Sequence, residues 1–394
     1  MTQQSAPGRP AVLSLVLAAV AVFTTTTAPA SAQQTRAAER DRGTTERPAQ
    51  PRRPVKVNQP RAESLYVSTD PADHPQRDFE RDIASKARTD SIYAARSRGV
   101  MEFTKIKYRS AAGDIDVPAY LFAPLNKRGA RGHAAMVWVH GGVHGDWGPT
   151  MLPFVKEAVE RGYVIIAPDY RGSNGYGAAH YNAIDYGGKE IDDVKGAYDH
   201  LKTLPYVDSD RIGVMGWSHG GFIASHLVMR EETPFKAAAA IVPVTNLIFR
   251  LGFKGPSYQR SFATQAAIGG LPHEKRDEYI KRSPLYQVEK LKVPILVHVA
   301  TNDLDVNYVE DEQMVWKLRA LKPDLSETKV YVDPAPWGSS AGHAFSRRVD
   351  PNTLERVDSP EQIDSWNRTW VFFEWILRPY HDKSKPAAAN NQDR

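Results

Sequence analysis

The chain has 394 residues, with 51 Lys or Arg against 46 Asp or Glu and no cysteine, so disulfide and thiol chemistry are excluded. The net charge of +5 is concentrated in residues 33–61, which carry eight Lys or Arg and three Asp or Glu. From residue 62 onward the chain is close to neutral. This balance lacks the basic footprint of a nucleic-acid-binding domain, so no nucleic-acid partner is predicted.

The first 32 residues resemble a secretory signal peptide. Arg9 is their only charged residue, and the apolar stretch 11–23 is too short to span a bilayer. Ala30-Ser31-Ala32 is an A-x-A cleavage site. We therefore expect an exported protein, periplasmic or extracellular, with cleavage near Ala32 and no integral membrane span.

Composition divides the rest of the chain. Residues 33–61 are rich in Pro, Arg, Gln and Thr and predict a disordered basic linker. Within an N-terminal extension, 62–100, residues 78–97 predict a helix that packs on the following domain through Phe79, Ile83, Ile92 and Tyr93. Residues 101–381 form the predicted catalytic domain, and 382–394 a flexible tail.

Strand and helix patterns alternate through the catalytic domain. Residues 101–109 and 117–122 predict an antiparallel edge, and later apolar runs predict strands at 135–139, 164–167, 211–215, 237–242, 295–299 and 329–332. Helical spacing fills the intervals. This order predicts an α/β fold with a mostly parallel central sheet and helices on both faces. No internal repeat is present.

His140-Gly141-Gly142 follows the strand at 135–139. Glycines at such a turn let a substrate approach the main chain. His140, His144 and Asp146 cluster here but match no metal-ligand spacing, so no metal and no cofactor are predicted. The turn has a better use as a donor of backbone N–H groups.

Gly216-Trp217-Ser218-His219-Gly220 lies between the strand 211–215 and a helical pattern. This is the G-x-S-x-G nucleophile elbow of the α/β-hydrolase fold, which predicts Ser218 as nucleophile. The oxyanion hole would combine the N–H of His219 with one from Gly141 or Gly142. The motif by itself also occurs by chance, so its value comes from this strand–turn–helix context.

The other members of a Ser–Asp–His triad follow in the expected order. Asp303 and Asp305 come just after the strand 295–299, and His343 lies on a Gly/Ser-rich loop after the strand 329–332. Both aspartates are candidates for the acid, with Asp303 favoured. His298 lies inside a strand, where a buried hydrogen bond is the simpler interpretation.

Substrate would lie against aromatic side chains. Residues 245–286 are aromatic and predict a wall of the substrate pocket, although the same residues could be ordinary core. Trp147, Tyr176 and Trp217 are candidate substrate-binding residues. Since these are apolar, a charged group beside the scissile carbonyl would be buried without a partner, and apolar groups should be preferred there.

Several separated segments resemble the catalytic domain of the prolyl oligopeptidase family of serine peptidases, in particular its acylaminoacyl-peptidase and dipeptidyl-peptidase branches. The similar segments are Tyr170-Arg171-Gly172-Ser173-Asn174-Gly175-Tyr176-Gly177, Gly187-Gly188-Lys189-Glu190-Ile191-Asp192-Asp193, the elbow with Gly221, Ser283-Pro284-Leu285, Asp303-Leu304-Asp305-Val306 and Gly342-His343-Ala344-Phe345. The resemblance covers about residues 100–380. It implies Ser218 as nucleophile, Asp303 as acid and His343 as base.

The chain departs from the family pattern in two ways. Family members usually show His-Gly before the acid loop, whereas this chain has His298-Val299 and one extra residue before Asp303. Many members also carry an N-terminal β-propeller, for which the chain ahead of residue 100 leaves no room. We therefore expect weaker size exclusion of substrates than in propeller-bearing relatives.

The sequence thus predicts a secreted serine hydrolase that acts through an acyl-enzyme. The leading interpretation is a peptidase for short peptides, and the alternative is a carboxylesterase for acyl or carbohydrate esters, because one triad serves both reactions. The sequence carries no signal for the oligomeric state or for endo- versus exo-cleavage.

Overall fold

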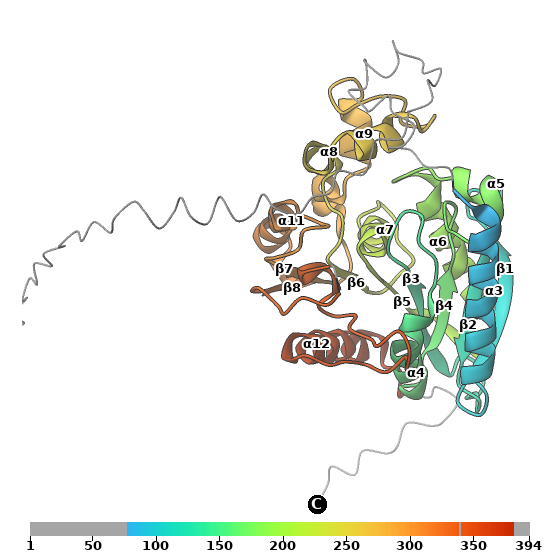
Figure 1. The fold of residues 1–394 in the computed structure, drawn as a ribbon. Coiled ribbons are helices and arrows are strands. Elements are labelled where there is room, and N and C mark those ends of the chain that lie inside the picture. Colours follow the sequence, from blue (N-terminus) through green and yellow to red (C-terminus); the bar gives the residue numbers. More distant parts are fainter. Residues whose placement is uncertain (1–76, 339, 382–394) are drawn as a thin grey trace, which may run out of the picture. The chain divides into compact units, whose positions relative to one another are not determined.

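The computed structural model describes residues 77–338 and 340–381. In this part of the chain, eight strands form one sheet with the order β1-β2-β4-β3-β5-β6-β7-β8 (Figure 1). The pairs β1–β2 and β2–β4 are antiparallel, and the other neighbouring pairs are parallel. The strands are Glu102–Arg109 (β1), Asp116–Ala123 (β2), His133–Val139 (β3), Val164–Pro168 (β4), Val207–Trp217 (β5), Ala238–Ile241 (β6), Ile295–Ala300 (β7) and Ser326–Tyr331 (β8). The predicted, mostly parallel sheet and its antiparallel edge are confirmed.

Helices cover both faces of the sheet (Figure 1). One face carries α6 (Lys189–Leu201), α7 (His219–Val228) and α11 (Tyr308–Leu321), and the other carries α3 (Phe79–Arg96), α4 (Leu152–Glu160) and α12 (Pro360–Leu377). Shorter helices lie in connections: α5 (Gly177–Asn182), α8 (Leu247–Lys254), α9 (Pro256–Ala263) and α10 (Arg276–Lys281).

Strand β3 shows why its sequence is continuously apolar. Ala135, Val137 and Val139 belong to the core on the α6–α7 face. The alternate residues Ala134, Met136 and Trp138 belong to the core on the α4–α12 face. Successive side chains of a strand point to opposite faces, so a strand covered on both faces must be apolar at every position.

The predicted helix at 78–97 is confirmed as α3, and Tyr93 is buried as predicted, but part of the buried face differs from the prediction. Ile83 is 47% exposed, while Lys86, Thr89 and Tyr93 are buried. The Lys86 ammonium lies 2.6 Å from the carboxylate of Asp169. Hydrophobic spacing misplaced this face because a buried ion pair, which the pattern ignores, holds the helix there.

Two further boundaries differ from expectation. Strand β5 begins at Val207 rather than at residue 211, and β8 begins at Ser326 rather than at 329. The predicted signal peptide, linker and tail lie outside the described residues. Among the helices of the described residues, none combines the length and the hydropathy that a bilayer crossing requires.

Candidate active site

Ser218 occupies the turn between β5 and α7 with φ 55° and ψ −119°. This left-handed backbone is costly for a residue with a side chain and is typical of a nucleophile elbow. The flanking glycines are required by close approach. A Cβ on Gly216 would lie 2.7 Å from the carbonyl oxygen of Val139, and one on Gly220 would lie 2.3 Å from it. The elbow is therefore pressed against the end of β3.

The structure brings His343 and Asp303 together although forty positions separate them. His343 Nδ1 lies 2.7 Å from Asp303 Oδ2, and both side chains are buried. Asp303 Oδ1 accepts hydrogen bonds from the N–H groups of Asp305 and Val306, at 2.8 and 3.0 Å. Oδ1 of Asp303 therefore stabilises the loop that carries it, and Oδ2 orients the imidazole of His343.

Glycine lets the loops that carry these two residues come together. A Cβ on Gly342 would lie 2.3 Å from Asn302 Oδ1 and 2.7 Å from the Ala300 side chain. The Gly342 N–H also donates to the Asn302 carbonyl at 3.2 Å. The extra residue before Asp303 is thus accommodated in a tight loop against Gly342.

Asp305, the rival candidate for the acid, lies on the other side of the imidazole. Its Oδ2 is 3.3 Å from His343 Nε2, and its carboxylate also pairs with Lys254 of α8. Burial opposes ionisation of Asp305, but His343 and Lys254 outweigh it and hold its pKa below the usual value. Within the described residues the Ser218 hydroxyl forms no hydrogen bond. Asp305 therefore occupies the nitrogen that a base would turn toward Ser218.

The turn after β3 lies against Ser218 and carries the glycines predicted to supply backbone donors. Gly142 has φ 75°, and its carbonyl accepts a hydrogen bond from the Tyr170 hydroxyl at 2.7 Å. Outside the regular elements of the described residues, no backbone hydrogen bond uses the N–H of Gly142 or His219 as donor. A Cβ on Gly141 would lie 3.4 Å from the Ser218 Cβ. Gly141 therefore lies next to the serine, and the oxyanion role of Gly141, Gly142 and His219 stays a prediction.

A buried ion network that the sequence reasoning missed supports this turn. Lys86 reaches from α3 to Asp169 and also donates to the Trp147 carbonyl at 3.1 Å. Asp169 accepts from the Trp147 N–H at 2.7 Å and from the Tyr176 hydroxyl at 2.6 Å. A Cβ on Gly175 would lie 2.5 Å from the Lys86 Cβ. No motif links these positions, since α3 lies far from them in the sequence.

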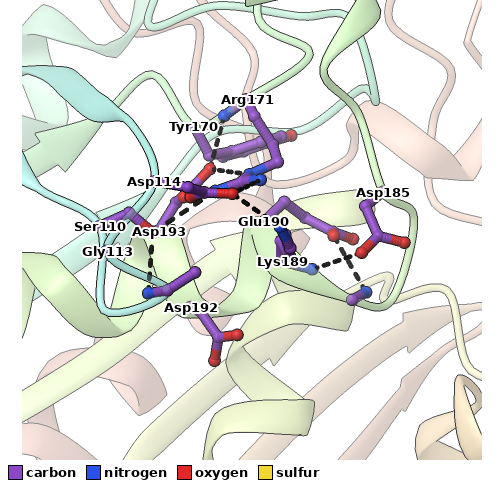
Figure 2. Close-up of polar contacts among 12 residues, drawn as sticks. Ser110, Gly113, Asp114, Tyr170, Arg171, Asp185, Lys189, Glu190, Asp192 and Asp193 are labelled. Atoms are coloured by element: carbon purple, nitrogen blue, oxygen red, sulfur yellow. Dashed lines mark hydrogen bonds and ion pairs between the residues drawn. The ribbon is translucent and has the colours of Figure 1, made fainter. Parts of the chain in front are cut away.

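A second buried network accounts for the segments at 170–177 and 187–193. The guanidinium of Arg171 lies between Asp193, at 2.8 Å, and Asp114, at 2.7 Å (Figure 2). Lys189 pairs with the same Asp114 at 2.7 Å. These contacts hold the loop after β4 against α6, so both motifs have a structural role here.

Glu190 is the other buried acid of this motif. It accepts hydrogen bonds from the N–H groups of Gly187 and Gly188 and lies 3.7 Å from the His219 ring. Burial raises the pKa of Glu190 to about 8. Burial also lowers the pKa of His219, and neither of its ring nitrogens has a hydrogen-bond partner among the described residues. The His219 ring is therefore packed in the interior as a neutral group.

The predicted substrate-binding aromatic residues are placed differently. Trp147 and Trp217 are 0% and 2% exposed and belong to the core, where Trp217 Nε1 donates to Ser346 Oγ. Tyr176 is only partly covered, but its hydroxyl is bound to Asp169. Aromatic composition does not reveal which face of the backbone a ring occupies, so the apolar frame expected from Trp147 and Trp217 is not supported.

The segment 245–286 forms α8, α9 and α10. It reaches the site through α8, where Arg250 donates to the Asp305 carbonyl at 3.1 Å and Lys254 pairs with the Asp305 side chain. A cavity of about 980 Å³ lies between α9 and the loop before α6, and neither Ser218 nor His343 lines it. The aromatic residues of this segment differ in exposure: Phe262 is buried and Phe253 is exposed.

Three other histidines considered as candidates, His298, His140 and His144, have hydrogen-bond partners. His298 is fully buried with Nδ1 2.9 Å from Ser365 Oγ, which confirms the hydrogen-bonded interpretation. His140 Nε2 lies 2.9 Å from Ser173 Oγ, and His144 Nδ1 lies 2.7 Å from the Gly172 carbonyl. Among the described residues no three His, Asp or Glu side chains are grouped so as to hold a metal ion.

A serine on the turn after a central parallel strand, followed by an aspartate and a histidine on later loops, characterises serine hydrolases of the α/β-hydrolase fold. Comparison with protein families agrees with this class and narrows it. The family model of the prolyl oligopeptidase family matches residues 152–350, just over half of the chain. The chain belongs to this family.

Individual relatives match part of their own length. An uncharacterised peptidase, YuxL, of Bacillus subtilis is 28% identical over 326 residues, covering 78% of this chain and 47% of that protein. The acylamino-acid-releasing enzyme of Arabidopsis thaliana is 30% identical over 221 residues, covering 55% and 28%. The chain therefore spans less than half the length of these relatives.

A solved structure shows the same fold. The acylaminoacyl peptidase of Pyrococcus horikoshii superimposes with a TM-score of 0.58 at 21% identity, over 73% of this chain and 44% of that one. The aligned part corresponds to the catalytic domain of the neighbour.

Proposed function

We propose that this protein is an exported serine peptidase that cleaves short peptides through an acyl-enzyme on Ser218. The observation that carries the proposal is the buried hydrogen bond of 2.7 Å between His343 Nδ1 and Asp303, on loops next to the strained elbow. Relatives named acylamino-acid-releasing enzyme and dipeptidyl-peptidase 5 favour a peptide over an ester as substrate.

In this mechanism the Ser218 hydroxyl attacks the scissile carbonyl and His343 Nε2 accepts its proton. Asp303 holds the imidazole in the tautomer that leaves Nε2 free and stabilises the imidazolium. The N–H of His219 and one from Gly141 or Gly142 donate to the oxyanion. His343 then gives the proton to the leaving amine, and water hydrolyses the acyl-enzyme by the same steps. Asp305 must first release Nε2.

The proposal is tested on the purified mature protein with matched peptidyl and short-chain ester substrates and a fluorophosphonate probe. Ser218→Ala should abolish both turnover and labelling while the circular dichroism spectrum stays unchanged. Ser225→Ala, a buried serine on α7, is the matched control and should keep both activities. Labelling of the Ser218→Ala variant would contradict the assignment, and turnover of esters alone would point to a carboxylesterase.

Export is proposed from residues 1–32. The N-terminal residue of the protein recovered outside the cytoplasm should be Gln33, which follows the Ala30-Ser31-Ala32 site. Recovery of the full-length chain inside the cytoplasm alone would contradict export.

A further inference from the structure

Arg347 is a partly exposed cation near the site, and it has no counter-charge in the described part of the chain. Its Nε is buried without a hydrogen-bond partner, and no carboxylate reaches ion-pair distance of its guanidinium. Cations buried in the same domain each pair with a carboxylate: Lys86 with Asp169, Arg171 with Asp193, Arg211 with Asp208, Arg250 with Glu310 and Arg282 with Asp185. A desolvated, unpaired guanidinium is costly unless a ligand supplies the anion.

The guanidinium of Arg347 points to the reacting centre. A Cβ on Gly141 would lie 3.7 Å from Arg347 Nη1 and 3.4 Å from the Ser218 Cβ. The guanidinium and the serine therefore flank one point at the oxyanion turn. Burial lowers the pKa of Arg347, against the attraction of Asp303 and Asp305, as expected for a cation that has lost water and gained no direct partner.

The position of Arg347 also identifies which part of a substrate it meets. Arg347 follows His343 on the same loop, and its N–H donates to the Ala344 carbonyl at 3.0 Å. In the triad mechanism the histidine returns its proton to the leaving amine, so the leaving group lies on the histidine side. A residue spans about 3.8 Å along the chain, so a carboxylate on the first leaving residue stays close to the serine.

We infer that Arg347 binds the free C-terminal carboxylate of the leaving group and makes this enzyme select peptides with very few residues after the scissile bond. Planar pairing of guanidinium with carboxylate provides two parallel hydrogen bonds, which suits this recognition. The inference rests on the proposed function, because it assumes that Ser218 and His343 carry out the cleavage.

The test compares N-acetyl-Phe-Ala as the free acid and as the C-terminal amide. A charge-assisted hydrogen bond predicts that the wild-type enzyme favours the free acid by about 10- to 100-fold in kcat/KM. Arg347→Gln should bring the ratio of free acid to amide to about one, and Arg347→Lys should keep an intermediate ratio, because an ammonium binds as a point charge.

Arg348→Gln is the matched control. Arg348 is the next residue, lies over the Trp337 ring at 5.1 Å and also has no carboxylate partner in the described residues. Its removal changes the local charge equally and should leave the ratio at the wild-type value. A wild-type ratio near one, or a fall of both substrates together in Arg347→Gln, would overturn the inference and indicate contact with the oxyanion instead.

Failure of the proposed function gives a different result. If no peptide is cleaved but esters are, the same comparison is made with N-acetyl-Phe esterified to lactic acid or to lactamide. A preference for the lactate that disappears in Arg347→Gln supports the inference on an esterase, and an equal rate for both rejects it. If Arg347→Gln does not fold, the wild-type ratio and the Arg347→Lys ratio decide.

Discussion

The two sides of the candidate site treat buried charge differently. On one side, α3, the loop after β4 and α6 carry Lys86, Asp169, Arg171 and Asp193, and each of these groups has an opposite charge within 3 Å. On the other side, the loop after β8 carries Arg347 with no opposite charge at contact distance in the described residues. We interpret the paired charges of the first side as structural, and the unpaired Arg347 as a group that can bind a ligand.

This contrast also shows that the segments resembling family motifs need not contain the residues that bind substrate. The segments at 170–177 and 187–193 carry many charged residues, but the structure supplies partners for them: Arg171 pairs with Asp193 and Asp114, and Lys189 pairs with Asp114 (Figure 2). The loop that follows His343 contains no familiar motif beyond the histidine, and it brings the Arg347 guanidinium close to the turn beside Ser218. A check of which buried polar groups have hydrogen-bond or ion-pair partners thus finds candidate binding residues that motif matching overlooks.

The largest expected effect concerns the acid. Asp303→Asn should lower kcat by about 10⁴-fold, because the amide favours the wrong imidazole tautomer. Asp305→Asn removes a half-exposed carboxylate that contacts Nε2 and should change kcat by less than about 10-fold, since exposed ion pairs contribute little. Steady-state kinetics on one peptide substrate measure both. The reverse ranking would assign the acid to Asp305.

The next effect concerns the stability contributed by the buried Lys86–Asp169 ion pair. Lys86→Met leaves Asp169 buried without its cation and should lower the free energy of unfolding by about 3–5 kcal/mol, as loss of one partner of a buried pair does. Lys105→Met, which breaks the exposed pair with Asp90, is the control and should cost about 0–1 kcal/mol. Urea unfolding of both variants decides. Equal losses would show that the Lys86–Asp169 pair carries no special weight.

The smallest effect concerns pH. Glu190 has a pKa of about 8 in the folded protein, above its usual value of 4.5, so the unfolded chain loses this proton first as pH rises. The wild-type free energy of unfolding should therefore decline between about pH 4.5 and 8 through this group.

Glu190→Gln should flatten that decline, since the amide does not titrate. Glu160→Gln, at the exposed end of α4, is the control and should keep the wild-type slope. Unfolding by urea at a series of pH values gives both slopes. An unchanged slope in Glu190→Gln would mean that other groups govern stability in this range.

Much of the fold was predictable because it depends on local patterns. Apolar runs separated by turns identified the central strands, and the flanking glycines identified the elbow, which needs them because Gly216 and Gly220 press against Val139. The order of Ser218, Asp303 and His343 along the chain located the candidate triad residues, each after its own strand. Predictions for residues 1–76 and 382–394 remain predictions.

The sequence by itself determined which elements form and which chemical groups follow each strand, since periodicity and turn chemistry act over a few residues. Tertiary structure alone decided what those groups touch. It turned Lys86 inward to Asp169, took Trp147 and Trp217 into the core, and set Asp303 and Asp305 on opposite nitrogens of His343. It also left Arg347, close to Ser218, without a carboxylate partner among the described residues, because pairing depends on contacts between distant segments.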